Sequence, residues 1–391
     1  MELKINSALL AVQLEKVIGF VPTKSVLNII TNILFSVKGG VLTLSAIDLE
    51  HSISAACPIG ALPETEVSVA VPPKILIDTL KALDEQILTI KVSGNIFHIE
   101  ADKSKFKINV QDGADFPEAK VDKETLVSFA ITTDALIRAT QATVFAVAKD
   151  ELKPAMTGVY LRVEREQITF VATDAHRLVN YKYLDFSCDL PGDVTEKAII
   201  VSPKTLNQIV KDAPKCGSDC ATISFNDRFI SVVLGDVRIS SRLIDARFPT
   251  YENVIPASSP TRAILNRADT LAAVKRMAIY ASKNTRLIRF GFAEHLLEIS
   301  ADETDTSDVG AHGAKETVQC MIDGERNEDG GYLEIGFNAA LTAEIFSNVS
   351  NSEIVIEMDT PGRAAVVKPA EQLPGEYLEM LLMPIMLGAS Y

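Results

Sequence analysis

Apolar residues recur at helical spacing near the start of each third of the chain. In the first third, Leu10, Leu14 and Val17 fall at positions i, i+4 and i+7. This one-sided pattern predicts an amphipathic helix. Segments that begin at Ile131 and Leu265 start in the same way. We therefore expect three helices in equivalent places.

Each of these predicted helices is followed by a segment in which apolar and polar residues alternate, which is typical of half-buried strands. These segments are residues 42–54, 168–181 and 297–310, and they contain Asp48, Asp174 and Asp302 respectively. A second helix and further strand-like runs then follow in every third. The second helices are expected at 72–83, 202–212 and 337–349, and the later strand runs at 87–111, 221–244 and 353–369.

The first helix, the alternating segment, the second helix and the later strand run recur in the same order in each third. This recurrence indicates a threefold internal repeat. A chain of 391 residues is long enough for several domains. Polar stretches near 120–128 and 255–263 separate the repeats. The expected domains are 1–122, 123–256 and 257–391, each of α+β class. Such units can be laid edge to edge in an arc, and closure with a second copy would leave no strand edge exposed.

Composition limits the function. The chain carries a net charge of −14, which argues against a tight grip on nucleic acid. Its five cysteines lack metal-ligand spacing, so we expect reduced thiols, no metal and no cofactor. No apolar run is long enough for a membrane helix, and the N-terminal segment does not resemble an export signal. A cytoplasmic protein without a membrane partner is expected.

Asp174 and His176 offer the best argument for an enzyme, because strand spacing would place both on one face as an acid–base pair. No nucleophile accompanies them, and the sequence lacks GxSxG, P-loop, GxGxxG and HExxH motifs. We interpret His176 and Arg177 as polar walls of a binding groove, and we expect no catalytic activity.

Three short motifs carry a resemblance to a known family: "ATDAHRL" at 172–178, "RFPTY" at 247–251 and "LLMPIML" at 381–387. Together with the threefold repeat, they resemble the β sliding clamp of bacterial DNA polymerase III over the full length of the chain. The resemblance implies three tandem copies of a clamp domain, each with two helices packed on antiparallel sheets. Two chains would close head to tail into a homodimeric ring that slides on duplex DNA as a processivity factor for DNA replication.

The resemblance also implies a hydrophobic pocket that binds peptides from partner proteins. Its expected residues are Met156, Thr173, Ala175, His176, Arg177, Leu178, Pro249, Val254, Leu381, Leu382, Met383, Pro384, Ile385 and Leu387. The implied partners are the replicative polymerase subunit, the clamp loader, repair polymerases and mismatch-repair proteins. Ala175 stands where the family usually has Gly, and Met386 where Arg is common, so partner preference is left open.

For the dimer interface, the resemblance implies that Phe106 and Ile108, with Lys74 nearby, face Ile279 and Tyr280 of the other chain. The alternative is that these apolar side chains are ordinary core residues. The expected DNA contacts are independent of base sequence and use Lys24, Lys149, Lys153 and Lys204. The nucleoid of a bacterium is the expected location.

The predicted helices are expected to present a basic surface to DNA, in contrast to the acidic chain as a whole. Their basic residues are Lys16, Lys74, Lys81, Arg138, Lys204, Lys211, Lys275 and Arg276. The other function that the sequence leaves open is a triplicated scaffold that binds proteins without encircling DNA.

Overall fold

The structure is a computed structural model that describes residues 2–59, 66–117, 127–302, 313–324 and 333–387. Its internal contacts divide the chain into two compact units. The first unit comprises Met1–Ile137, Cys188–Asp193 and Lys204–Ile244, and the second comprises Arg138–Ser187, Val194–Pro203 and Asp245–Tyr391. The middle third of the chain therefore contributes to both. Of the expected domain boundaries, 122/123 lies outside the described residues, and 256/257 stays a prediction.

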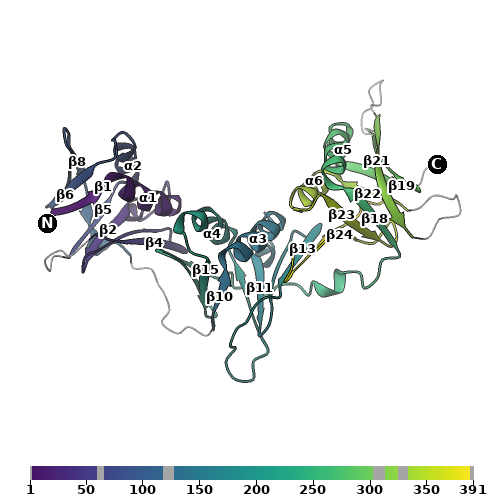
Figure 1. Cartoon of the computed structure of the whole chain (residues 1–391), viewed down its shortest axis with the longest axis horizontal. Helices are drawn as coiled ribbons and strands as arrows, with labels where there is room; N and C mark the ends of the chain where they lie inside the picture. The colour runs from purple at the N-terminus through teal and green to yellow at the C-terminus, as the bar shows by residue number, and fades with distance from the viewer. Residues whose placement is uncertain (1, 60–65, 118–126, 303–312, 325–332, 388–391) are drawn as a thin grey trace. The chain divides into compact units, whose positions relative to one another are not determined.

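Six α-helices occur in the described residues, in the order that the repeat predicts (Figure 1). They are α1 (Ser7–Val17), α2 (Pro73–Lys81), α3 (Thr133–Thr143), α4 (Pro203–Cys216), α5 (Arg267–Tyr280) and α6 (Ala339–Ser347). The predicted apolar stripe is confirmed, because Leu10, Leu14 and Val17 are completely buried. Within the described ranges, no helix combines the length and apolar composition needed to cross a membrane.

The beginnings of the helices follow from local chemistry. The Asn6 Oδ1 accepts hydrogen bonds from the first turn of α1, including one of 2.8 Å from the Ala8 N–H. Asn266 and Asn338 cap α5 and α6 in the same way. Helices α2 and α4 instead begin at Pro73 and Pro203, where the missing N–H has no intrahelical partner to lose.

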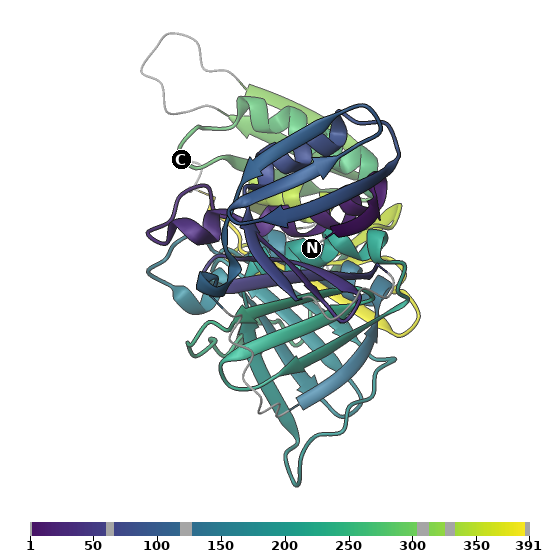
Figure 2. The ribbon, with the colours of Figure 1, turned by 90° about the vertical axis from the view of Figure 1, so that its left-hand side faces the viewer.

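The first unit contains a four-stranded sheet and a nine-stranded sheet, both antiparallel, with the strand orders β1-β6-β7-β8 and β10-β15-β16-β17-β4-β3-β2-β5-β9. The strands are β1 (Glu2–Asn6), β2 (Ile33–Lys38), β3 (Val41–Ile47), β4 (His51–Pro58), β5 (Val67–Val71), β6 (Ile87–Ser93), β7 (Ile96–Glu100), β8 (Lys105–Asn109), β9 (Gln111–Asp112), β10 (Val127–Thr132), β15 (Cys220–Phe225), β16 (Phe229–Leu234) and β17 (Val237–Arg242). Helix α1 packs on α2 and on strands β3 and β4. Strand β8 lies beside α2 (Figure 2), and residues near β8 and on α2 line one groove.

The second unit contains a twelve-stranded sheet with the order β14-β11-β12-β13-β25-β24-β23-β18-β21-β20-β19-β22. The strands are β11 (Val159–Glu164), β12 (Ile168–Thr173), β13 (Arg177–Tyr183), β14 (Glu196–Val201), β18 (Thr261–Asn266), β19 (Leu287–Phe292), β20 (Leu296–Asp302), β21 (Gly313–Asp323), β22 (Glu334–Asn338), β23 (Glu353–Met358), β24 (Ala365–Pro369) and β25 (Glu376–Leu382). Helices α5 and α6 lie side by side, and α5 packs on β20 and β21 (Figure 1).

The segments that the sequence predicts as alternating are hairpins rather than single strands. Residues 42–54 form β3 and β4 with a turn at Asp48, and residues 168–181 form β12 and most of β13 with a turn at Asp174. The alternation spans both strands, so the pattern alone does not reveal the turn. In the third segment β20 ends at Asp302, whose side chain lies outside the described part of the chain.

Candidate functional site

The turn between β12 and β13 brings several of the predicted pocket residues together. The Asp174 Oδ1 accepts hydrogen bonds of 3.0 Å from the main-chain N–H groups of His176 and Arg177. The Thr173 hydroxyl donates to the Arg177 carbonyl oxygen at 2.6 Å and accepts from the Ala175 N–H at 3.1 Å. Ala175 has a φ of +75°, a left-handed conformation that a side chain disfavours. The turn is therefore held tightly by its own polar groups.

These contacts do not make Asp174 and His176 an acid–base pair. Both residues lie in the turn rather than on a strand, which corrects the expectation of a shared strand face. The Asp174 carboxylate bonds the main-chain N–H of His176 and, at 3.1 Å, the Arg177 Nε. Its hydrogen bonds thus hold the turn and orient a guanidinium instead of polarising an imidazole.

Arg177 joins three parts of the second unit. Its Nη1 donates to Glu344 Oε2 of α6 at 2.5 Å, and its Nη2 donates to the Phe145 carbonyl oxygen at 2.8 Å. The guanidinium also lies over the Phe145 ring, with its carbon 5.0 Å from the ring centroid. The side chain is buried. Arg177 therefore fixes α6 against the β12–β13 turn, and its polar atoms have partners within the chain.

The C-terminal apolar run divides into a buried part and a surface part. Strand β25 pairs antiparallel with β13, so that Leu381 lies opposite Leu178 and Leu382 opposite Arg177. Both leucines are buried in the sheet. Met383 is 44% exposed, and its N–H donates to the His176 carbonyl oxygen at 2.9 Å. The exposed end of the chain thus begins at Met383, directly beside the turn.

The remaining predicted pocket residues lie on other segments of the same unit. The Ile385 N–H donates to the Gly336 carbonyl oxygen at 2.8 Å, which places the end of the described tail on β22, and Pro384 and Leu387 flank this contact. Met156 belongs to the 3₁₀ turn Pro154–Thr157, Pro249 follows β17, and Val254 ends the 3₁₀ turn Glu252–Val254. Their approach to the β12–β13 turn remains a prediction.

Two residues that support this site, Phe145 and Glu344, were not predicted. Glu344 lies 167 positions from Arg177 along the chain. Nothing in the local pattern around Glu344 indicates that partner, because only the packing of α6 brings the two together. The cluster "TDAHR" gives the one available signal, since an arginine needs an acidic partner when it is buried.

Polar bridges also link β25 to α3 and to β13. The Arg138 Nε donates to Glu376 Oε1 at 2.9 Å, and the Asn180 Nδ2 donates to Glu379 Oε1 at 2.9 Å. Burial raises the pKa of Tyr181, and the nearby Glu376 carboxylate raises it further. The charge of Arg138 is therefore paired within the chain, although its side chain remains 43% exposed on α3.

Other basic helix residues are also used inside the protein. Lys16 is buried, and its Nζ lies 2.6 Å from Asp236 Oδ2, so its expected place on an exposed helix face is wrong. Lys81 and Arg276 form ion pairs with Glu15 and Glu316. Within the described residues, Lys74, Lys211 and Lys275 form no ion pair. The net positive charge of the helices is smaller than their sequence indicates.

The four predicted DNA contacts differ in their surroundings. Lys24, Lys149 and Lys153 are exposed in loops. Lys204, at the start of α4, forms an ion pair with Asp48, and its Nζ lies 5.2 Å from the centroid of the Phe20 ring. The positive charge of Lys204 is therefore partly neutralised by Asp48 within the chain.

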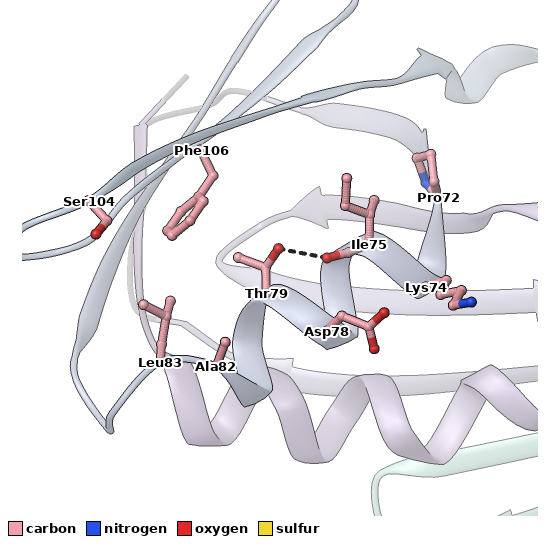
Figure 3. Close-up of a pocket in the computed structure, with 9 residues that line it drawn as sticks. All are labelled: Pro72, Lys74, Ile75, Asp78, Thr79, Ala82, Leu83, Ser104 and Phe106. Carbon is pink, nitrogen blue, oxygen red and sulfur yellow. Dashed lines mark hydrogen bonds between the residues drawn. The ribbon is translucent and has the colours of Figure 1, made fainter.

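Two of the expected interface residues of the first unit lie at a groove of about 750 Å³ between α2 and β8 (Figure 3). Lys74 and Phe106 line this groove, together with Ile75 and Leu83. Ile108 is only 3% exposed, so it is a core residue and its predicted place at the interface is corrected.

The expected interface residues of the second unit lie at the end of α5. Ile279 is 78% exposed and Tyr280 is 41% exposed. Large apolar side chains with this much exposed area are candidates for contact with another chain. They are therefore not ordinary core residues.

Comparison with known proteins accounts for the chain from end to end. Models of the DNA polymerase III beta subunit match residues 1–120 (N-terminal domain), 130–250 (central domain) and 252–386 (C-terminal domain). The beta sliding clamp of Pseudomonas aeruginosa is 25% identical over 384 residues, covering 97% of this chain and 99% of the relative. That of Synechococcus elongatus is 26% identical over 369 residues and covers 94% of each chain.

Solved structures agree. A crystal structure of the sliding clamp of Pseudomonas aeruginosa bound to griselimycin has a TM-score of 0.88 at 25% identity, with 99% of this chain and 100% of the other covered. The DNA polymerase III beta subunit of Thermotoga maritima gives 0.84 at 22% identity, with the same coverage, and supports the fold. The chain belongs to the DNA polymerase III beta subunit family, the bacterial β sliding clamps.

Proposed function

We propose that this chain is a DNA polymerase processivity factor that encircles duplex DNA, slides along it and holds a polymerase there. The observation that carries this proposal is the match of all three family domains in order along one chain. The paired helices packed on antiparallel sheets support it. A ring holds DNA by topology, so the net charge of −14 is compatible with this function.

The ring is a head-to-tail homodimer, in which the α2–β8 groove of one chain receives the end of α5 of the other. The exposed Ile279 and Tyr280 support this pairing, as do the apolar Ile75 and Phe106 in the groove. Replacement of Ile279 by Asp should give soluble monomers, measured as hydrodynamic mass by light scattering. An unchanged mass would contradict this interface.

Sequence-independent contacts with DNA phosphates come from Lys24, Lys149, Lys153 and Lys204 in this proposal. The exposure of the first three in loops supports the assignment. For Lys204, phosphate competes with Asp48 for the ammonium group. These contacts are weak, which suits movement along the duplex.

The exposed tail from Met383, the β12–β13 turn and the segments of Met156, Pro249 and Val254 form the groove for partner peptides in this proposal. Exposed methionine side chains support it, because they adapt to several apolar ligands. The partners are the replicative polymerase subunit, the clamp loader, repair polymerases and mismatch-repair proteins. The protein is non-catalytic and acts on the bacterial nucleoid in the cytoplasm.

The topology of DNA binding provides the decisive test. The purified protein is loaded on a nicked circular plasmid with a clamp loader and separated by gel filtration. The protein should remain with the circle and be lost when a restriction enzyme linearises the plasmid, because the ring slides off the ends. Equal retention on both forms contradicts encirclement, and binding to neither form supports the alternative of a protein-binding scaffold.

A further inference from the structure

The first unit repeats the Asp174 turn at Asp48. The Asp48 Oδ1 accepts hydrogen bonds from the main-chain N–H groups of Glu50 at 3.2 Å and His51 at 2.8 Å. Leu49, which follows the aspartate as Ala175 does, has a φ of +80°. The His51 Nδ1 lies 3.0 Å from Asp48 Oδ1, so His51 takes the place that Arg177 has in the second unit.

The strand beside this turn is also equivalent. Strand β17 pairs with β4 so that Ser241 lies opposite His51 and Ser240 opposite Ser52. In the second unit, the same two positions of β25 are occupied by Leu382 and Leu381. The main-chain plan is therefore repeated, while the two leucines are replaced by serines.

The surface beside this turn is hollowed. Two adjoining cavities of about 270 and 480 Å³ share the residues Ile47, Ser52, Pro117 and Ser240. We call this surface the serine groove and define it by Ile47, Ser52, Pro117, Arg238, Ser240 and Arg242. Pro117 follows an Asp-Phe pair, as Pro249 follows an Arg-Phe pair in the next repeat.

The described residues of the serine groove carry more positive than negative charge. Within the described residues, neither Arg238 nor Arg242 forms an ion pair. Arg238 makes a long hydrogen bond of 3.4 Å from Nη1 to the Ser231 hydroxyl. The carboxylate among the lining residues is that of Glu50, whose carbonyl oxygen accepts from the Arg242 N–H at 2.8 Å. Two guanidinium groups against one carboxylate form an unusual site in a chain of net charge −14.

The serine groove also has an apolar floor and a buried ring nitrogen that is free to form a hydrogen bond. Ile47 and Phe116 belong to one buried cluster, and Leu34 packs against it. The His51 side chain lines the groove and is buried, and its Nε2 has no hydrogen-bond partner in the described part of the chain. Serine hydroxyls both donate and accept, so the walls suit the main chain of an extended segment.

We propose that the serine groove is a second docking site, for an acidic peptide segment of a partner protein with a short apolar anchor. The carboxylates pair with Arg238 and Arg242, and the anchor packs on Ile47. Charge complementarity selects this occupant, because guanidinium groups bind carboxylates through paired hydrogen bonds. The apolar floor favours a peptide over a bare polyanion.

The test uses the full chain and a fluorescent peptide, DEDIVDED, with NQNIVNQN as the uncharged match. Fluorescence polarisation gives the dissociation constant for the unmodified protein and for Arg238→Gln and Arg242→Gln. Arg262→Gln alters an exposed arginine of β18 and is the matched control. Met383→Ser alters the proposed partner-peptide groove of the second unit. Thermal unfolding of every variant confirms that it is folded.

Each groove arginine variant should bind DEDIVDED about tenfold more weakly than the unmodified protein does. The unmodified protein should bind NQNIVNQN more weakly than DEDIVDED by a similar factor. The Arg262→Gln and Met383→Ser variants should bind like the unmodified protein. Equal binding of the two peptides, or unchanged binding by both groove variants, overturns the proposal. Loss of binding in Met383→Ser assigns the peptide to the other groove. Tighter binding of a ten-base oligothymidylate that also depends on Arg242 would show a nucleic-acid site instead.

Discussion

In both units an aspartate turn precedes a strand that pairs with a strand from the following repeat, β4 with β17 and β13 with β25. In the second unit, the Arg177 side chain extends from the turn and donates a hydrogen bond to Glu344 on α6. In the first unit, His51 takes this place and bonds Asp48, while Lys204 approaches the same carboxylate from α4. A repeated main chain thus carries different ion pairs.

The same difference extends to the surfaces beside the turns. The second unit presents the apolar tail from Met383, whereas the first presents serines and two arginines. Both strand pairs form, because the ladder that joins the strands is made of main-chain hydrogen bonds. The repeated fold therefore provides two equivalent junctions that carry different side chains.

The largest effect is expected from Arg177→Ala. This change leaves Asp174 without its guanidinium and should lower the free energy of unfolding by about 3 kcal/mol, because a buried charge loses its partner. Urea denaturation followed by circular dichroism measures it. Glu344→Gln, which keeps a hydrogen-bond acceptor at a more exposed position, should cost less. A smaller loss in the free energy of unfolding for Arg177→Ala than for Glu344→Gln would contradict the assignment of Arg177 as the residue that joins the turn to α6.

The Asp48 turn should show a smaller effect that depends on pH. Burial by itself raises the pKa of the Asp48 carboxyl, but the hydrogen bonds from His51 and Lys204 outweigh it and hold the pKa below its ordinary value. The stabilisation is therefore complete above the unfolded pKa, near 4, and is lost as the pH falls through the lower folded pKa.

Asp48→Asn removes this charge and should lower the free energy of unfolding by about 2 kcal/mol at pH 7. The difference between the two proteins should shrink as the pH falls below about 4, because the Asp48 carboxyl takes up a proton first in the unfolded chain and only at lower pH in the folded protein. Thermal unfolding at several pH values measures it. A difference that grows toward low pH would show that Asp48 is destabilising when charged.

Removal of the residues from Met383 onward should weaken binding of a polymerase-derived peptide at least about tenfold, equal to about 1.4 kcal/mol. The strand β25 should survive, because Leu381 and Leu382 keep their pairing with β13. Calorimetric titration measures the affinity. The matched deletion from Leu381 removes two buried leucines and should also destabilise the second unit. Full peptide affinity after the shorter deletion would place the peptide site elsewhere.

The smallest effect is expected from Ala175→Gly. Ala175 has a φ of +75°, and a glycine relieves the strain there, so we expect a gain of about 0.5–1 kcal/mol in the free energy of unfolding. Leu49→Gly tests the equivalent position of the first unit. A rise in the melting temperature measures each gain. A loss of stability at Ala175 would mean that its methyl group makes a packing contact worth more than the strain.

Much of the fold could be predicted from local patterns. The six helices occur where apolar spacing and the threefold repeat predict them. The asparagine caps and leading prolines that the structure shows are also local signals, which act within a few residues. The hairpin turns at Asp48 and Asp174 were missed, because alternation continues through both strands. The exposure of Lys16 and Ile108 was also mistaken, because helical or strand position does not reveal what packs against a side chain.

The sequence by itself determined the threefold order of helices and strands, the family, and the apolar character of the C-terminal run. Tertiary structure alone decided which part of that run is buried, and that Arg177 meets Glu344. It also decided that Ser52 and Ser240 share a groove with two arginines. The physical reason is that helix and strand signals are local, whereas an ion pair or a groove depends on strands and helices brought together from distant positions in the chain.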